Sequence, residues 1–114
     1  MPAIDISREL TDYYIMKKRK PIHPGVVLEL DFLKPMGLSQ SRLAADLHVP
    51  ARRINEIVHR KRSVSADTAL RLGRYFNISA QFWLNLQSHF DLENERDHSG
   101  SRLDREVKIL AAAA

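Results

Sequence analysis

The amino-acid sequence predicts an all-α fold of five short helices around one core. Apolar residues recur at helical spacing, and no segment shows the alternating pattern of a half-buried strand. Residues that favour helix ends, mainly serine, proline, asparagine and glycine, divide the chain into short segments. A length of 114 residues leaves room for a single hydrophobic core, so we expect one folded domain.

The first predicted helix covers residues 24–34. It begins at Pro24, because a missing backbone N–H costs little in the first helical turn. Its apolar side chains are expected on one side: Val26, Val27, Leu30 and Leu33. Pro35 and Gly37 then predict the end of this helix.

The next two predicted helices cover residues 39–47 and 50–59 and are joined by a tight turn. Ser39 is a good N-cap for the first of them, and Pro50 restarts the chain for the second. His48 stands where such turns need a positive φ angle, which His adopts more readily than a bulky residue does. Two short helices joined in this way predict a helix-turn-helix unit.

The last two predicted helices cover residues 65–76 and 79–90. Ser65 and Ser79 are expected to cap their first turns, and Asn77 can take the left-handed conformation that ends the earlier one. The apolar positions at helical spacing are Ala69, Leu72, Gly73 and Phe76 in the first and Phe82, Trp83, Leu86 and Phe90 in the second. We expect Trp83 in the core or at a dimer contact, rather than in a ligand-stacking pair with Phe82.

The two ends of the chain are predicted to lie outside the domain, which we place at residues 23–92. Residues 1–22 are expected to form a mobile arm, whose KKRK run at 17–20 either adds phosphate contacts or is simply solvated. Residues 93–114 are expected to form an acidic tail with a Ser-Gly-Ser linker. Its terminal EVKILAAAA fits a short helix or a strand equally well.

Composition argues against several classes of protein. The chain has no cysteine, and its five histidines lack the close spacing of metal ligands, so we expect neither a metal nor another cofactor. No nucleophile stands beside a base and no glycine-rich loop could hold a phosphate, so we do not expect an enzyme. No run could span a membrane and no signal peptide is evident, which predicts a cytoplasmic protein without a membrane partner.

The outward face of the 50–59 helix carries side chains that suit DNA bases. Ile54, Ile57 and Val58 are expected to face the core, which leaves Arg52, Asn55, Glu56 and His59 outward. Arginine can fork onto guanine and asparagine onto adenine, and a small residue such as Ala51 can touch a thymine methyl group. Such residues are often only solvated, but their combination behind a tight turn favours DNA reading. The predicted base-contacting residues are Ala51, Arg52, Asn55 and Glu56.

The charge distribution agrees with a nucleic-acid partner. Between residues 42 and 62, six basic residues stand against two acidic ones, and the whole chain has a formal net charge of +4. Gln40 and Ser41 open the 39–47 helix, where backbone N–H groups and polar side chains can meet a phosphate.

Residues 23–92 resemble the HigA-type antitoxins, a branch of the Cro/repressor-like (lambda-repressor-like) helix-turn-helix proteins of bacterial toxin-antitoxin operons. The resemblance covers over half of the chain and rests on four motifs: HPG, LSQSRLA, RRINEIVHRKRSVSADTALRL and FWLNLQSHFDL. It implies that residues 50–59 form the recognition helix. It also implies that Gln40, Arg53, Arg60 and Lys61 contact phosphates.

The resemblance further implies a homodimer that binds double-stranded operator DNA, represses its own operon and neutralises a RelE-like ribonuclease toxin of the HigB type. Two alternatives remain open at this point. The chain could be a stand-alone phage-type transcriptional repressor without a toxin partner, or an interaction module that masks a partner and no longer binds DNA. If substitution of Arg52 and Asn55 left function unchanged, the chain would be the interaction module.

Overall fold

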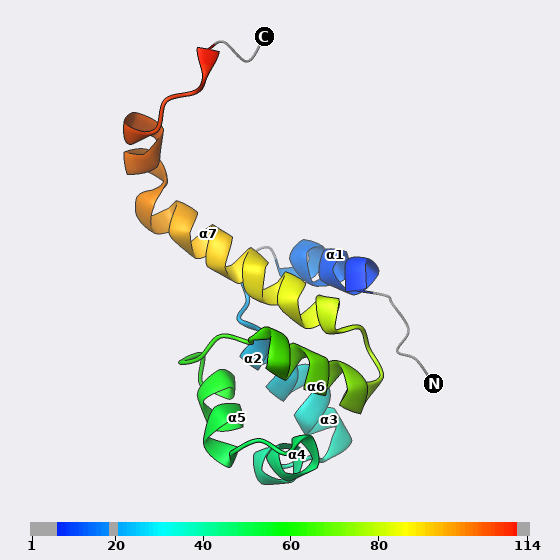
Figure 1. Ribbon diagram of the computed structural model, residues 1–114. Helices are drawn as coiled ribbons and strands as arrows, with labels where there is room; N and C mark the ends of the chain where they lie inside the picture. The colour runs from blue at the N-terminus through cyan, green and yellow to red at the C-terminus, as the bar shows by residue number, and fades with distance from the viewer. Residues whose placement is uncertain (1–6, 19–20, 112–114) are drawn as a thin grey trace.

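The computed structural model describes residues 7–18 and 21–111, and this part of the chain is helical with no β-strand (Figure 1). The elements are α1 (Ser7–Lys18), α2 (Pro24–Val27), the π-helical turn η1 (Leu28–Leu33), α3 (Lys34–Met36), α4 (Gln40–Leu47), α5 (Ala51–Val58), α6 (Ala66–Phe76) and α7 (Ala80–Glu106). The predicted all-α class is confirmed. Part of the KKRK run, Arg19 and Lys20, lies outside the described residues.

The first predicted helix corresponds to the continuous stretch α2, η1 and α3, and it runs past Pro35 rather than ending there. In a regular α-helix the proline ring would clash with the carbonyl four residues earlier. Here the N–H of Lys34 bonds to the carbonyl of Glu29, five residues back, and this wider turn accommodates the ring. The stretch ends at Gly37 (φ 64°), where the N–H of Leu38 donates to the Leu33 carbonyl at 2.9 Å.

Aromatic side chains form the centre of the core. Trp83 and Phe82 at the start of α7 are fully buried, and the rings of Phe32 and Trp83 have centroids 5.1 Å apart. Trp83 is therefore a core residue. This contact packs η1 against α7 within the hydrophobic core.

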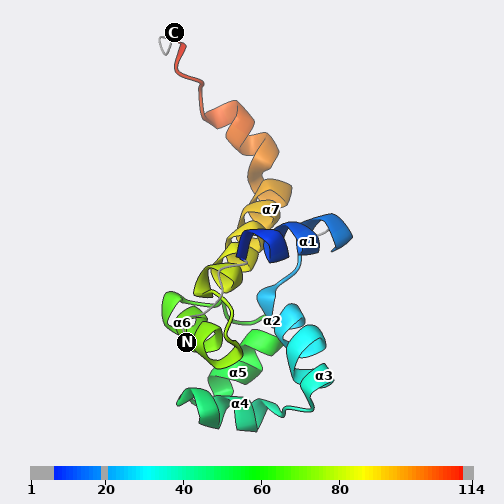
Figure 2. The same cartoon turned by 90° about the vertical axis from the view of Figure 1, so that its right-hand side faces the viewer.

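Residues 7–18 differ from the predicted arm, because they form α1 and lie against α7 (Figures 1 and 2). The segment has no sustained apolar period of its own. Its helix is supported instead by tertiary contact, with Leu10 packed against the core and Thr11 buried.

Helix α7 continues to Glu106 through the predicted Ser-Gly-Ser linker, so the predicted boundary after residue 92 falls inside it. Side chains three and four positions apart support the added turns. The pairs are Arg96 with Glu93, Ser99 with Glu95 and Arg102 with Glu106. Val107 is extended and ends the helix.

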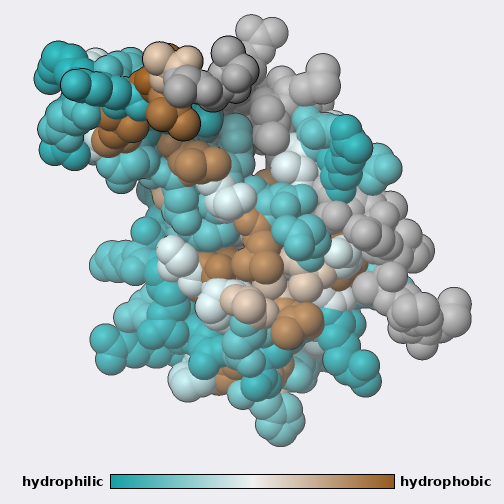
Figure 3. Space-filling model, turned by 45° about the horizontal axis from the view of Figure 1, so that its top comes forward, coloured by the Kyte–Doolittle hydropathy of each residue, from teal (hydrophilic) through white to brown (hydrophobic). Residues whose placement is uncertain are grey.

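The far part of α7 projects away from the bundle (Figure 2). Apolar side chains gather at its end (Figure 3). The exposed apolar residues there are Leu103, Val107, Ile109 and Leu110. No helix among the described residues is both long and apolar enough to cross a membrane.

His23 joins the bundle at the start of α2. Its Nδ1 accepts a hydrogen bond from the Gly25 N–H at 2.9 Å, and its ring packs edge-on against Phe90 of α7. The residue is only 4% exposed. Burial lowers the pKa of His23, and this effect outweighs the raising influence of the Arg62 carbonyl and the Asp91 carboxylate.

We expect the free energy of unfolding to fall as the pH drops below the ordinary histidine pKa of 6.5. The unfolded chain binds a proton at His23 in this range before the folded chain does, so stability is lost between 6.5 and the lowered pKa of the folded state. Urea titrations at several pH values measure the loss. His23→Asn keeps an N-cap acceptor and should flatten the pH dependence. If the pH dependence of stability were unaltered in His23→Asn, groups other than His23 would be responsible for the loss of stability.

Candidate nucleic-acid interface

Helices α4 and α5 form the predicted helix-turn-helix unit. The Ser39 side chain caps the first turn of α4 by accepting a backbone hydrogen bond at 3.0 Å. The helix ends at His48, whose φ of 58° is left-handed, and the Val49 N–H then donates to the Ala44 carbonyl at 3.0 Å. The predicted cap and the predicted positive φ at His48 are both confirmed.

Helix α5 has a buried face and an exposed face, with Arg53 and Glu56 half-buried between them. Ile54, Ile57 and Val58 are buried. Ala51, Arg52, Asn55 and His59 are exposed. The prediction is confirmed for Arg52, Asn55 and His59, whereas Glu56, also predicted to face outward, is half-buried. Pro50 and His59 flank the helix.

The HPG motif explains how α2 holds α5 in place. Gly25 packs directly on the backbone of α5, and a Cβ atom added to it would lie 1.8 Å from the carbonyl oxygen of Ile57. Only glycine permits this approach. His23 and Pro24 cap and begin the helix that presents Gly25 to α5.

Three charged side chains meet on the exposed face of α5. The Nε of Arg52 donates to Glu56 at 3.0 Å, and the Nε of Arg62 lies 3.1 Å from the other Glu56 oxygen. These contacts, led by the hydrogen bond from Arg52, lower the pKa of Glu56. The Arg52 side chain remains 84% exposed and bonds Glu56 through Nε, which leaves its two terminal nitrogens available to a further acceptor.

A second contact links the two helices of the unit on the same face. The Nδ2 of Asn55 donates to the Oε1 of Gln40 at 3.2 Å, which joins α5 to the start of α4. The Asn55 side chain keeps a second N–H and its own amide oxygen, and the Gln40 side chain keeps both hydrogens of its NH₂ group. The arrangement leaves polar groups from both helices available to one ligand.

The remaining predicted contacts fall into separate groups. Ser41 and Ala51 are exposed at the starts of α4 and α5. Arg60 and Lys61 are exposed in the turn after α5, at the opposite end of that helix from Ala51, and Arg60 has a left-handed φ of 63°. Arg53 is not exposed beside Arg52 and Asn55.

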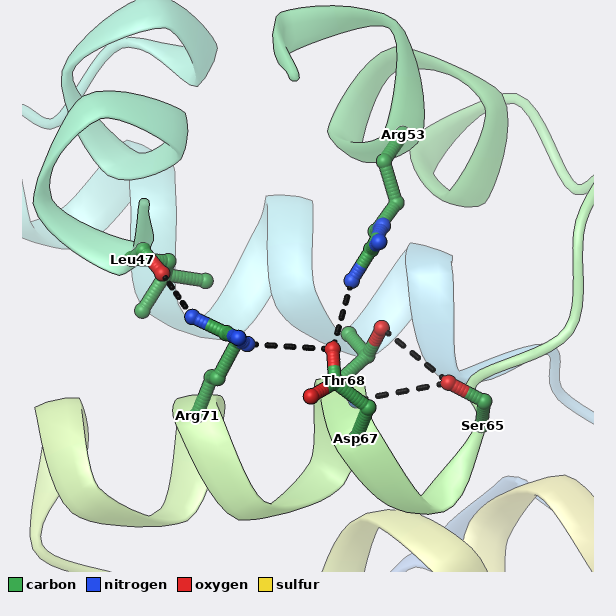
Figure 4. Close-up of polar contacts among 6 residues, drawn as sticks. All are labelled: Leu47, Arg53, Ser65, Asp67, Thr68 and Arg71. Carbon is green, nitrogen blue, oxygen red and sulfur yellow. Dashed lines mark hydrogen bonds and ion pairs between the residues drawn. The ribbon is translucent and has the colours of Figure 1, made fainter. Parts of the chain in front are cut away.

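Arg53 points toward α6 (Figure 4). Its Nη1 donates to the Oδ2 of Asp67 at 2.7 Å, and the Nε of Arg71 donates to the same oxygen at 3.0 Å. Arg71 also donates to the carbonyl of Leu47 at 2.8 Å. We call these three charged residues, Arg53, Asp67 and Arg71, the clamp.

Sequence reasoning missed three residues at this interface, Arg62, Asp67 and Arg71. Arg62 was counted among the basic residues but not assigned to the face, and its contact with Glu56 spans a turn that a helical wheel does not describe. Asp67 gave no sequence signal beyond its place in the first turn of a helix, where acidic residues are common. Among the described residues, no group of three metal-ligating side chains occurs.

Comparison with known proteins identifies related chains. A helix-turn-helix family model matches residues 31–83. The structure of the Pseudomonas aeruginosa antitoxin HigA with the higBA promoter is similar, with a TM-score of 0.78 and 45% identity over 80% of this chain and 99% of that one. Antitoxin HigA-1 of Vibrio cholerae is 30% identical over 82% of this chain and 84% of its own length. Virulence-associated protein I of Dichelobacter nodosus is 58% identical over 63% of this chain and 67% of its own length.

Proposed function

Because the chain belongs to the HigA-type antitoxin family of Cro/repressor-like helix-turn-helix proteins, we propose that it binds an operator in its own promoter and represses its own operon. Family membership confirms the predicted fold and the expectation that the chain is not an enzyme, since its relatives are DNA-binding antitoxins and regulators. The observation that carries the proposal is the exposed face of α5, where Arg52 and Asn55 retain free hydrogen-bonding groups beside Gln40.

Helix α5 is proposed to enter the major groove with Arg52 and Asn55 toward the base edges. The two terminal nitrogens of Arg52 can donate together to guanine O6 and N7. The free N–H and carbonyl oxygen of Asn55 match adenine N7 and N6, and Asn55 can keep its bond to Gln40 while it makes them. Ala51 would contact bases through its methyl group. We retain Glu56 as a base contact, although Arg52 and Arg62 already share its oxygens.

The start of α4 is proposed to fix the register on the DNA backbone. The unused amide NH₂ of Gln40 and the exposed hydroxyl of Ser41 are donors for a phosphate oxygen. Because Gln40 also holds Asn55, a phosphate contact at Gln40 would orient a base-contacting side chain.

Arg60 and Lys61 are proposed to contact phosphates at the other end of α5. We expect Arg60→Gln to weaken binding to operator and scrambled DNA about equally and to reduce the slope of log K against log salt by roughly one unit, because one counterion fewer is released. Titrations at several salt concentrations measure the slope. The matched control is Lys108→Gln, near the projecting end of the chain, which should leave the slope unchanged. An unchanged slope in Arg60→Gln would remove Arg60 from the phosphate contacts.

The protein is further proposed to act as a homodimer. A two-fold dimer would place two recognition helices roughly 34–36 Å apart, one turn of DNA, and would require an inverted repeat in the operator. The exposed apolar residues at the end of α7 are candidates for the contact between copies, since such patches mark association sites. Sedimentation of the purified protein tests the dimer, and a monomer at micromolar concentration would argue against it.

We also propose that the protein neutralises a RelE-like ribonuclease toxin of the HigB type. Support comes from family membership and from the projecting, locally acidic part of α7, which suits a basic partner. Co-expression with the neighbouring small open reading frame should relieve growth arrest and yield a complex that copurifies. Absence of such a neighbour would leave the stand-alone repressor as the better explanation.

A further inference from the structure

We propose that Asp67 is a positioning residue for operator recognition, which fixes how α5 is presented to DNA by holding Arg53 of α5 and Arg71 of α6 on one carboxylate oxygen. The inference rests on the proposed operator binding. It assigns Arg53 a role through Asp67 in place of the phosphate contact that the family resemblance implied.

The Asp67 carboxylate joins α5 to α6, and Arg71 extends the link to the end of α4 (Figure 4). Arg53 and Arg71 both donate to the Oδ2 of Asp67, at 2.7 and 3.0 Å. Arg71 then reaches the carbonyl of Leu47 at the end of α4, at 2.8 Å. Both helices of the helix-turn-helix unit therefore contact neighbouring residues of α6, α5 through Asp67 and α4 through Arg71.

The packing of the helices indicates why α5 needs the support of the clamp. Helix α5 packs mainly on α4 and α2, and α4 packs on α6, but α5 has no extensive packing interface with α6. The Arg53–Asp67 pair provides a direct link between α5 and that helix. Because Gly25 of α2 supports the Ile57 end of α5, the clamp supplies a second support nearer its start.

The clamp also accounts for the orientation of Arg53. Its side chain is 28% exposed, against 84% for the neighbouring Arg52, and it is directed at α6. The hydrogen bonds from Arg71 and Arg53 lower the pKa of Asp67, so the carboxylate stays ionised at neutral pH. An ion pair this close to solvent contributes little to stability, so we expect its loss to change geometry more than folding.

The test is a set of variants in the full chain, titrated against the DNA upstream of its own gene and against scrambled DNA at several salt concentrations. Asp67→Asn and Arg53→Gln should each lower the operator-to-scrambled affinity ratio by about tenfold, and the double variant should lose no more than either one. Arg53→Gln should leave the salt slope unchanged. Asp67→Glu keeps the charge and should largely restore the ratio. Asp97→Asn, an exposed carboxylate on the projecting part of α7, is the matched control.

Three kinds of result would contradict the positioning role of Asp67, and a fourth would contradict operator binding itself. If Arg53→Gln reduced the salt slope by roughly one unit while Asp67→Asn tightened binding to both DNAs, Arg53 would be a phosphate contact and Asp67 only a nearby repulsive charge. Additive losses in the double variant, or a lowered melting temperature with an intact ratio, would also overturn the positioning role. A ratio near one in the unmodified protein would instead overturn the proposed function.

Discussion

Gly25→Ala is expected to destabilise the protein by about 3 kcal/mol or more. The added Cβ would lie 1.8 Å from the carbonyl oxygen and 2.6 Å from the carbonyl carbon of Ile57. Both are backbone atoms, so no side-chain rotation can relieve the overlap. Helices α2 and α5 would have to separate, which would open the core beside Ile57 and move the recognition helix.

Urea denaturation followed by the fluorescence of buried Trp83 measures this loss. Gly100→Ala is the matched control, because a methyl group added there would meet no atom within 4 Å and α7 is helical at this position. We expect Gly100→Ala to raise stability by about 0.5–1 kcal/mol. Equal stability of Gly25→Ala and the unmodified protein would contradict the close contact between α2 and α5.

Arg52→Ala is expected to cost about 1–3 kcal/mol at one operator base pair, a loss of roughly 5- to 150-fold in affinity. The expectation follows from the two terminal nitrogens of Arg52, which the contact between its Nε and Glu56 leaves unoccupied. Without them the protein should no longer distinguish a guanine at that position from other bases. Competition titrations with operators substituted at each base pair identify the position.

The control for this variant is Arg96→Ala. Arg96 is also an exposed helical arginine paired with a glutamate on its own helix, but it lies on the projecting part of α7. It should leave discrimination at every base pair unchanged. If Arg52→Ala lost equal affinity for operator and scrambled DNA, Arg52 would be a phosphate contact and the assignment of the α5 face would need revision.

The helices that could be predicted from the sequence are those whose ends are set locally. Ser39 and Ser65 bond to their own first turns, and His48 and Asn77 take the left-handed conformation within the residues that they terminate. Such signals lie within a few positions of one another and can be found without tertiary information. The same holds for the two faces of α5, which follow from helical periodicity.

The elements that the sequence did not predict depend on more distant contacts. Helix α1 has no apolar period and is supported by α7, and the Ser-Gly-Ser stretch is helical because the flanking side chains pair along α7. At the interface, Arg53 was expected to contact phosphate because of the family resemblance, and its partner Asp67 stands 14 positions away, beyond the reach of local sequence signals. The role of Gly25 likewise depends on Ile57, a residue of another helix.

Operator recognition is tested most directly by titrating the purified protein against the DNA upstream of its own gene and against scrambled DNA of equal length, at two salt concentrations. Specific binding typically exceeds non-specific binding by roughly 10³ or more, and we expect a ratio of that order to persist at the higher salt. A ratio near one at both salt concentrations would contradict operator recognition by α5.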